Sequence, residues 1–282
     1  MITLKRGDWA MTVLPDLGGA IGSLTLRGED VLRPTPEGCD QILLTASFPL
    51  APYANRIDHG RFVFEDRKVA LPPTPSFEPH ALHGDAWCAP WTVEAHDAVS
   101  FTLSQSHEAG AWPWAWMVRQ TLSLEDHGLN AEIALTNLSD APMPAGVGFH
   151  PYFLRGPETR LTLAADKVWV GDSLIPDQQV ATDELVDWSR GQVVEAMPFV
   201  DNAYALWDGR AEVADGHRTV CLTASANARW AHVYAPVGAA YVCVEPVTHR
   251  PNALNAPPGE DAGVQTLPPG ETLTLAMRIE AE

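Results

Sequence analysis

Apolar and polar residues alternate with a period of two along most of the chain. The clearest stretches are AIGSLTL (20–26), RFVFED (61–66), VSFTLSQS (99–106), RTVCLTAS (218–225) and AAYVCVE (239–245). A period of two places successive side chains on opposite faces of a strand, whereas an amphipathic helix repeats every 3.6 residues. The pattern therefore predicts many short β-strands, each with one buried and one polar face.

Turn residues separate these strands throughout the chain. The segment 116–137 (WMVRQTLSLEDHGLNAEIALTN) predicts two strands around an Asp-His-Gly turn, and 265–282 predicts a Pro-Pro-Gly turn before a last strand. The chain contains 24 Pro and 21 Gly, and it predicts no helix beyond one short turn at 183–191. An all-β sandwich or barrel follows, which we expect to form one domain over residues 1–282 because no break in composition divides it.

The charge of the chain narrows the choice of ligands. Asp and Glu total 36 against 18 Lys and Arg, for a formal net charge of -18 among 282 residues. Such a charge repels nucleic acid and anionic membranes, so an uncharged small molecule is the expected partner, although the charge is also explained by solubility alone. The absence of a leader pattern, of a membrane-length apolar run and of closely spaced pairs among the four cysteines predicts a cytoplasmic protein.

His150 is a candidate for proton transfer. It lies in GFHPYF (148–153), where Pro151 favours an extended backbone and aromatic residues surround the imidazole. An imidazole can donate or accept a proton near neutral pH, and aromatic rings suit the apolar faces of sugars. A structural core histidine is the alternative.

Two further histidines occur in EPHALHGDAW (78–87). His80 and His83 are three residues apart, but Pro79 and Gly84 argue against a helix that would pair them on a metal. We expect no metal site there. His83, at the end of an irregular Pro-rich segment, is expected to face a ligand, and His80 is equally consistent with a surface position.

Polar residues next to two further strands are candidates for ligand binding. Asn55 and Arg56 precede the strand at 61–66, and Arg56 offers fixed donors for hydroxyl groups or a carboxylate. Asp201 precedes an aromatic strand in FVDNAYALWDG (199–209). Salt bridging for Arg56 and turn formation for Asp201 are the structural alternatives.

Glu245 is an acidic residue in an otherwise apolar strand, YVCVEP (241–246). Alternation places it on one face with Tyr241 and Cys243, at the end of the strand, because Pro246 is expected to stop regular pairing. An apolar setting raises the pKa of a carboxyl group, which suits a general base. The alternative is a structural ion pair, with three possible partners nearby: Arg56, His249 and Arg250.

Five segments in this order resemble the aldose 1-epimerase (galactose mutarotase) family. They are NRIDHGRF (55–62), LHGDAW (82–87), GFHPYF (148–153), VDNAYALWDG (200–209) and VCVEPVTHRPNALN (242–255). The resemblance extends from about residue 10 to the C-terminus. It implies a large antiparallel β-sandwich, the supersandwich of this family, that requires neither a metal nor an organic cofactor.

The resemblance also implies roles for six residues. Glu245 matches the family's catalytic base and His150 its catalytic acid. The residues that match substrate-binding positions are His83, Arg56, Asp201 and Asn55. The expected function is therefore interconversion of the α and β anomers of a free monosaccharide, by a monomer or homodimer.

Three other functions remain open at this point. A hexose-6-phosphate epimerase of similar fold would need a cationic pocket, which an acidic chain without clustered Arg or Lys does not predict. A sugar-binding protein without activity would need neither Glu245 nor His150. A glycosidase would use Glu245 and Asp201 as paired carboxyl groups.

Overall fold

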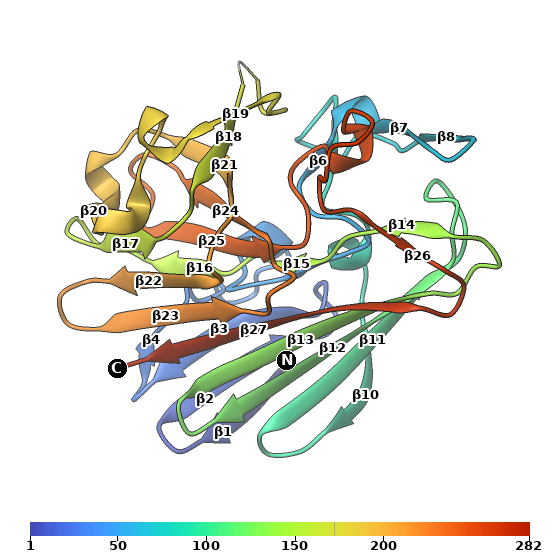
Figure 1. Ribbon diagram of the computed structural model, residues 1–282. Coiled ribbons are helices and arrows are strands. Elements are labelled where there is room, and N and C mark those ends of the chain that lie inside the picture. Colours follow the sequence, from blue (N-terminus) through green and yellow to red (C-terminus); the bar gives the residue numbers. More distant parts are fainter. Residues whose placement is uncertain (172) are drawn as a thin grey trace.

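Two large antiparallel sheets make up most of the protein. The computed structural model describes residues 1–171 and 173–282 and is shown in Figure 1. The nine-stranded sheet has the order β10 (Thr92–His96), β11 (Ser100–His107), β12 (Trp116–Glu125), β13 (Gly128–Asn137), β27 (Thr272–Ala281), β23 (Thr219–Ala224), β22 (Arg210–Ala214), β17 (Arg160–Leu163) and β20 (Gln192–Val193). The other has the order β19 (Gln178–Ala181), β18 (Lys167–Val170), β21 (Val200–Ala205), β24 (Trp230–Ala235), β25 (Tyr241–Val247), β15 (Gly148–Phe149) and β5 (Pro49–Leu50), with β16 (Tyr152–Leu154) also paired with β25.

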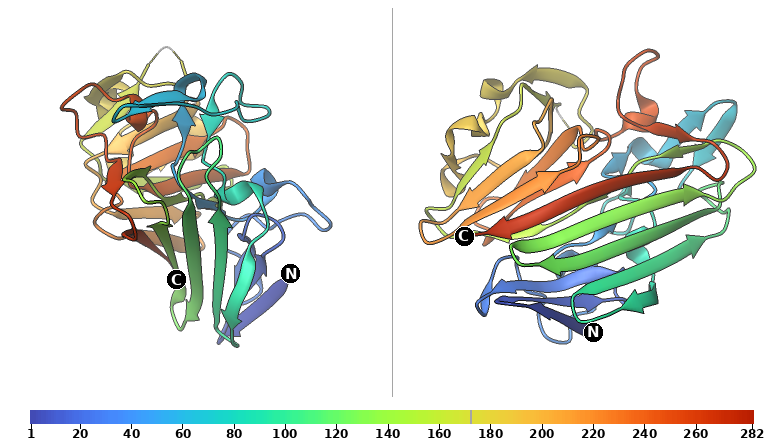
Figure 2. Two further views of the ribbon diagram at one scale, coloured as in Figure 1. Left: turned by 90° about the vertical axis from the view of Figure 1, so that its right-hand side faces the viewer. Right: turned by 60° about the horizontal axis from the view of Figure 1, so that its bottom comes forward.

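Smaller sheets complete the sandwich. The N-terminal sheet is a meander of β1 (Ile2–Arg6), β2 (Trp9–Leu14), β3 (Ala20–Leu26) and β4 (Glu29–Asp30). Three strand pairs are β6 (Arg56–Ile57) with β9 (Ala81–Leu82), β7 (Arg61–Phe64) with β8 (Arg67–Ala70), and β14 (Met143–Ala145) with β26 (Gln265–Leu267). Figure 2 shows the N-terminal meander beside the edge of the nine-stranded sheet where β10 and β11 lie.

The helical elements of the described residues are short 3₁₀ turns. They are η1 (Ile42–Leu44), η2 (Asp58–Gly60), η3 (Ala86–Cys88), η4 (Thr182–Glu184), η5 (Trp188–Arg190), η6 (Val194–Ala196) and η7 (Ala253–Asn255). Two of them, η4 and η5, fall in or beside the segment 183–191, where the sequence predicts one short turn. Within the described ranges, no helix combines the length and the apolar character that a membrane crossing requires.

The alternation of the sequence matches the faces of the strands. In β27 every second residue from Leu273 to Ile279 is buried, and β12 alternates in the same way. Glu125 pairs with Gly128, which leaves Asp126 and His127 as the tight turn of the β12–β13 hairpin. The predicted all-β antiparallel sandwich is therefore confirmed.

Strand β25 separates the core from the face that carries polar residues. Val242 and Val244 belong to the main core, which also contains buried residues of the nine-stranded sheet and the N-terminal meander. Cys243 belongs to a second, smaller apolar cluster on the opposite face, together with Phe48 and Tyr152. Side chains that alternate with the core valines therefore point away from the core, as the sequence predicts for Glu245.

One detail of the prediction is wrong. Pro246 does not stop regular pairing, because β25 continues to Val247, and the last pairs with β24 are Ala231–Pro246 and Trp230–Val247. A proline lacks only its own N–H group, so the residues on both sides of it can stay in the ladder. Glu245 consequently lies within the strand and not at its end.

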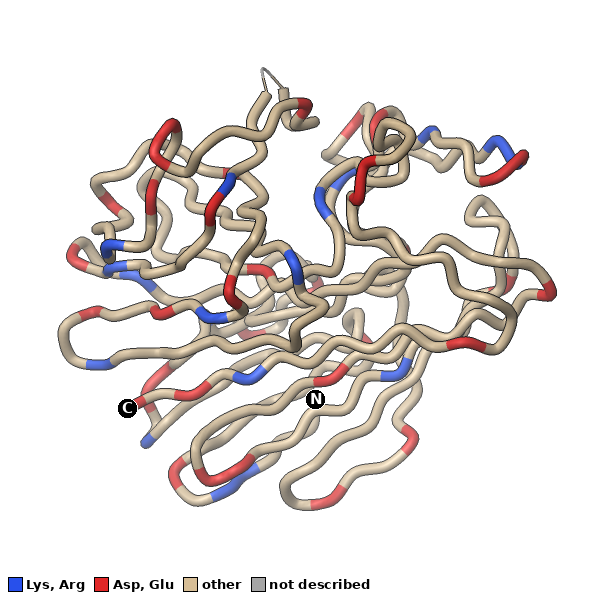
Figure 3. Tube along the Cα trace, in the orientation of Figure 1, with Lys and Arg blue, Asp and Glu red and all other residues tan. Residues whose placement is uncertain are grey.

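Acidic residues are spread over the whole trace and are not gathered on one element. Figure 3 shows them on turns and strands of both large sheets, with fewer Lys and Arg between them. A negative charge distributed in this way favours hydration of the surface and repels a polyanion.

Candidate active site

Strand β25 brings two histidines to Glu245 from its two neighbouring strands. On one side, His232 of β24 is directly opposite Glu245 in the ladder. On the other side, β15 and β16 pair with β25 before and after a gap formed by His150 and Pro151. The pairs that flank this gap are Gly148–Val247 and Tyr152–Cys243. The same register brings His150 opposite Glu245, so the ladder is interrupted where these two side chains meet.

The carboxyl group of Glu245 and the imidazole of His150 are in contact. His150 Nε2 lies 3.2 Å from Glu245 Oε1, and both side chains are buried. Burial raises the pKa of Glu245 well above its usual value, and the charge of Asp201 adds to this effect. Burial also lowers the pKa of His150, to about 3. A low-dielectric site disfavours charge on both groups, so the pair is expected to share one proton as a neutral acid and a neutral imidazole.

Aromatic rings hold the His150 imidazole in one plane. Its ring stacks between Phe48 and Tyr152, with centroid distances of 4.7 and 4.6 Å. The backbone N–H of His150 donates to the carbonyl of Phe48. The imidazole can therefore present Nε2 to Glu245 with little freedom to rotate, which is the arrangement needed for directed proton transfer.

His83 is a neutral hydrogen-bond donor beside His150. The backbone N–H of Asn55 donates to His83 Nδ1 at 3.0 Å, and the N–H of His83 donates to the carbonyl of Asn55. Because Nδ1 accepts this hydrogen bond, the ring proton is on Nε2. Burial, and then the nearby His150 and Arg56, lower the pKa of His83 well below its usual value. The two imidazole centroids are 5.5 Å apart.

Asp201 is held by two partners. Arg56 Nη2 donates to its Oδ2 at 3.2 Å, and His232 Nε2 donates to its Oδ1 at 2.6 Å. Burial alone would raise the pKa of Asp201, but the hydrogen bond and charge of His232 and the charge of Arg56 outweigh it and lower the pKa to about 2. Asp201 is therefore a permanent carboxylate, in contrast to Glu245.

Asn55 closes this arrangement into a ring of hydrogen bonds. Its Oδ1 accepts from the backbone N–H of Arg56 at 2.8 Å, and its Nδ2 lies 3.4 Å from His232 Nδ1 and 3.3 Å from His232 Nε2. Asn55, Arg56, Asp201 and His232 thus support one another. A buried polar network with its partners in place is rigid, which fixes the directions of these groups.

All six residues predicted from the sequence line one pocket of about 510 Å³. This volume lies in the usual range for small-molecule sites, roughly 300–1,000 Å³. Aromatic residues form much of the remaining wall, namely Phe77, Tyr152, Phe199, Tyr234 and Tyr241. Apolar ring faces beside convergent polar groups can hold a polyhydroxylated ring, with its C–H faces on the rings and its hydroxyls on the polar side chains.

Two basic residues of this lining, His232 and Arg33, were not predicted from the sequence. His232 stands in the middle of the apolar strand WAHVYA, the same anomaly that singles out Glu245, so this signal could have found it. Arg33 stacks on the ring of Tyr152 at 3.7 Å, and its Nη2 donates to the carbonyls of Leu43 and Thr45. No strand pattern marks Arg33, because it lies outside the regular strands.

The structural ion pairs considered for Glu245 are not formed. Arg56 is engaged with Asp201, and Arg250 with Glu260. The His249 ring accepts the backbone N–H of Ala54 and donates to the carbonyl of Arg250. Among the described residues, the one ion-pair partner recorded for Glu245 is His150.

Among residues 1–171 and 173–282, two groups of side chains could hold a metal ion. In the pocket, the ligand atoms of His83, His150 and Glu245 lie within 4.8 Å of one another. Outside it, Asp58, His59 and His80 form a second group. His80 therefore lies apart from the pocket residues, and the two histidines of the Pro-rich segment belong to different clusters.

Comparisons with known proteins agree with this geometry. The family model "Aldose 1-epimerase" matches residues 1–280. The uncharacterized protein YphB of Escherichia coli K12 is 29% identical to this chain over an alignment of 304 residues with gaps. The alignment covers 99% of this chain and 98% of the relative. A crystal structure of an Escherichia coli K12 protein superposes with a TM-score of 0.90 at 27% identity and 99% and 98% coverage.

More distant structures share the fold. A galactose mutarotase-like protein from Clostridium acetobutylicum has a TM-score of 0.87 at 22% identity, covering 99% of this chain and 94% of the other. The GalM/aldose epimerase homologue from C. elegans has a TM-score of 0.85 at 18% identity, with 100% and 98% coverage. With a family match over nearly every residue and a sandwich of the same architecture, the chain belongs to the aldose 1-epimerase family.

Proposed function

We propose that this protein is an aldose 1-epimerase that interconverts the α and β anomers of a free monosaccharide. The observation that carries the proposal is the buried pair of Glu245 and His150, 3.2 Å apart in a pocket lined by aromatic and hydrogen-bonding side chains. Anomer exchange requires one proton to leave the C1 hydroxyl and one to reach the ring oxygen. A paired acid and base are sufficient for this reaction.

The proposed reaction follows from the positions of these groups. Glu245 takes the proton of the C1 hydroxyl while His150 donates a proton to the ring oxygen, O5, and the C1–O5 bond breaks. The aldehyde then rotates about C1–C2. The ring closes on the other face of C1, the two proton transfers run in reverse, and no redox change or group transfer occurs.

The proton shared by Glu245 and His150 must lie on His150 before the reaction can begin. When the proton is on Glu245, both groups are neutral and their burial costs the least free energy. When the proton is on His150, the pair consists of a carboxylate base and an imidazolium acid and is ready to react. The two forms have the same net charge and differ by one transfer over 3.2 Å. We propose that a bound sugar, whose hydroxyls replace lost hydration, favours the second form.

The other predicted residues are proposed to hold the sugar. His83 presents its Nε2–H near His150, where it can stabilise negative charge on a reacting oxygen. Arg56 and Asp201 offer a fixed donor and a fixed acceptor for neighbouring hydroxyls, and Asn55 keeps them in place through its bonds to Arg56 and His232.

The activity is expected to depend on pH as a broad bell, because the active pair holds one proton. On the acid side, activity is lost when the pair takes a second proton, which the pKa of His150 places near 3. On the alkaline side, activity is lost when the remaining proton leaves Glu245, whose pKa is raised. In initial rates of mutarotation across pH, the acid limb should therefore lie near pH 3 and not at pH 6.5, the ordinary pKa of histidine, and an acid limb centred at pH 6.5 would contradict the assignment.

His232 is proposed to position Asp201. His232→Leu should raise KM by about tenfold and change kcat little, because the hydrogen bond to a charged partner is lost without loss of the proton-transfer pair. His232→Gln can still donate to Asp201 and should retain most of the affinity. A large fall in kcat with unchanged KM would instead place His232 in the proton transfers.

Polarimetry of freshly dissolved α-anomers tests the function itself. The purified protein should accelerate the approach to anomeric equilibrium for at least one sugar among galactose, glucose, arabinose, xylose and fucose. The Glu245→Gln protein serves as the control for trace contaminants. If the folded protein accelerates the mutarotation of none of these sugars, a sugar-binding protein without activity is the better description.

The two catalytic alternatives have less support from the site. Two guanidinium groups line the pocket, and Arg56 is already paired with Asp201, so Arg33 would have to hold a sugar phosphate by itself. A rate comparison between glucose and its 6-phosphate separates the two substrates. A glycosidase would need Asp201 as its ionised base or nucleophile, but both carboxylate oxygens of Asp201 are engaged, one by Arg56 and the other by His232.

A further inference from the structure

Strands β6 and β9 form a short ladder with different chemistry at its two ends. Arg56 pairs with Leu82 and Ile57 with Ala81. At one end, hydrogen bonds connect Asn55 and His83, which line the pocket. At the other end, the next residues along the two strands are Asp58 and His80. A feature that fixes this second end would therefore also support the backbone that presents the pocket residues.

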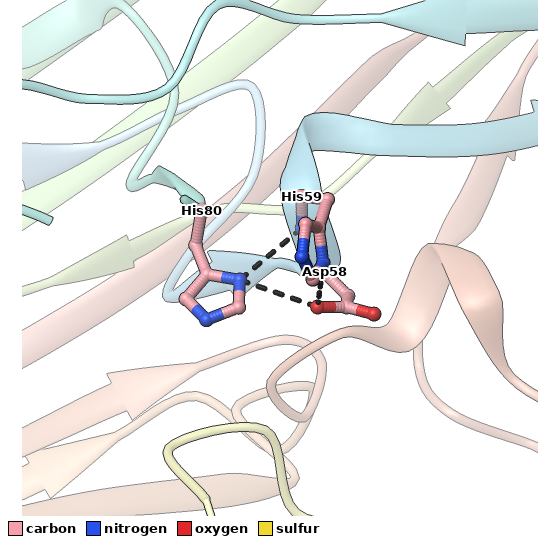
Figure 4. Close-up of side chains that lie close together, drawn as sticks. All are labelled: Asp58, His59 and His80. Carbon is pink, nitrogen blue, oxygen red and sulfur yellow. Dashed lines mark hydrogen bonds and ion pairs between the residues drawn. The ribbon is translucent and has the colours of Figure 1, made fainter. Parts of the chain in front are cut away.

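Three potential metal ligands meet at this second end. Figure 4 shows the side chains of Asp58, His59 and His80 directed toward one another. Asp58 Oδ1 lies 2.8 Å from His59 Nδ1 and 3.3 Å from His80 Nδ1, and the three side chains each have a ligand atom within 4.8 Å of those of the other two. Zinc bonds of 2.0–2.2 Å to nitrogen and oxygen place neighbouring tetrahedral ligands roughly 3.3 Å apart, so one ion fits this spacing after small side-chain rotations.

The contacts of His80 bring its Nδ1 lone pair close to the Asp58 carboxylate. The backbone N–H of His59 donates to His80 Nδ1 at 3.2 Å, which places the ring proton on Nε2. The lone pair on Nδ1 then also faces the Asp58 carboxylate at 3.3 Å. Two electron-rich atoms at that separation repel each other, and a cation that takes the Nδ1 lone pair in place of the His59 N–H removes the repulsion.

We propose that Asp58, His59 and His80 form a binding site for a divalent transition-metal ion of the zinc class. Two imidazole nitrogens and one carboxylate oxygen suit zinc, cobalt or nickel, whereas magnesium and calcium prefer sites made of oxygen ligands. The ion holds the end of the β6–β9 ladder together and takes no part in anomer exchange. The proposal of this metal site does not depend on the proposed epimerase activity.

The surroundings allow the coordination to be completed. Asp58 and His59 line a surface hollow of about 420 Å³ together with Arg61, Pro79 and Asn255. Water can reach the ion through this hollow and supply the fourth ligand. Arg61 is the cationic residue of the hollow, and its repulsion should keep the affinity moderate compared with a buried structural zinc site.

Titration calorimetry with Zn²⁺ on protein treated with a chelator tests the proposal. The wild-type chain should bind one equivalent, and Co²⁺ at the same site should produce the visible absorption of tetrahedral coordination. His80→Ala and the exposed His59→Ala should each weaken binding by at least about tenfold. At an ion concentration about a hundred times Kd, the Tm of the wild-type protein should rise by about 5 °C.

Matched variants distinguish this site from other histidines. His150→Asn removes a ligand of the pocket cluster and should bind the ion normally, as should His217→Ala, which alters an exposed histidine of the β22–β23 turn. Binding that disappears in His150→Asn but survives in His80→Ala would assign the ion to the pocket and overturn the proposal. No binding to the wild-type chain, or Mg²⁺ binding of equal strength, would overturn it as well.

Discussion

Glu245→Gln is expected to lower kcat for mutarotation by at least about a hundredfold, the usual contribution of a positioned general base. The amide has nearly the shape of the carboxyl group and can keep a hydrogen bond to His150, so the fold and the sugar affinity should persist. It cannot accept the hydroxyl proton, because an amide is not a base near neutral pH. The loss should therefore appear in kcat and not in KM.

Initial rates measured by polarimetry over a range of sugar concentrations provide the measurement. Glu132→Gln is the matched control, since it removes an exposed carboxylate from β13 and should leave the rate unchanged. His150→Asn should show a loss of similar size, because the second proton transfer then lacks its donor. If both Glu245→Gln and His150→Asn turn over at near-normal rates, the proposed roles are wrong.

Asp201→Asn is expected to reduce both stability and sugar affinity. The side chains of Arg56 and Asp201 are each 9% exposed, so removal of the carboxylate leaves a buried guanidinium without its counter-charge. Breaking a buried ion pair in this way costs about 3 kcal/mol. The donor–acceptor pair proposed to hold the sugar is lost at the same time, so KM should rise by at least about tenfold.

Urea unfolding and steady-state kinetics of a double variant separate the two effects. Adding Arg56→Met to Asp201→Asn removes the unpaired charge, so part of the lost free energy of unfolding should return. The activity should not return, because both side chains that are proposed to bind the sugar have been replaced. An Asp201→Asn protein with unchanged stability and KM would show that the pair serves neither purpose.

Much of the fold could be predicted from the sequence because strand formation depends on local patterns. The period-two stretch at 20–26 coincides with β3, and those at 61–66 and 239–245 overlap β7 and β25. The final strand, β27, follows its predicted turn in the same way. A single domain over residues 1–282 and a cytoplasmic location stay predictions.

Local sequence patterns predicted the candidate site less well than they predicted the fold. Taken by themselves, His150, Arg56 and Asp201 each allowed a structural and a functional interpretation, and the order of five family segments was needed to connect them. His232 escaped notice although it is a polar residue in an apolar strand, as Glu245 is. Its importance depends on Asp201, which is 31 residues away.

The sequence by itself determined which residues alternate, where turns interrupt them, and that an acidic residue occupies an apolar strand. Only the tertiary structure decided what that residue meets. The contact of Glu245 with His150 depends on how distant strands align in one sheet. The pairing of Arg56 with Asp201, 145 residues apart, depends on how the separate β6–β9 pair is placed against that sheet. A shift of one residue in that register would turn each side chain to the opposite face, and this alignment results from packing of the whole sandwich.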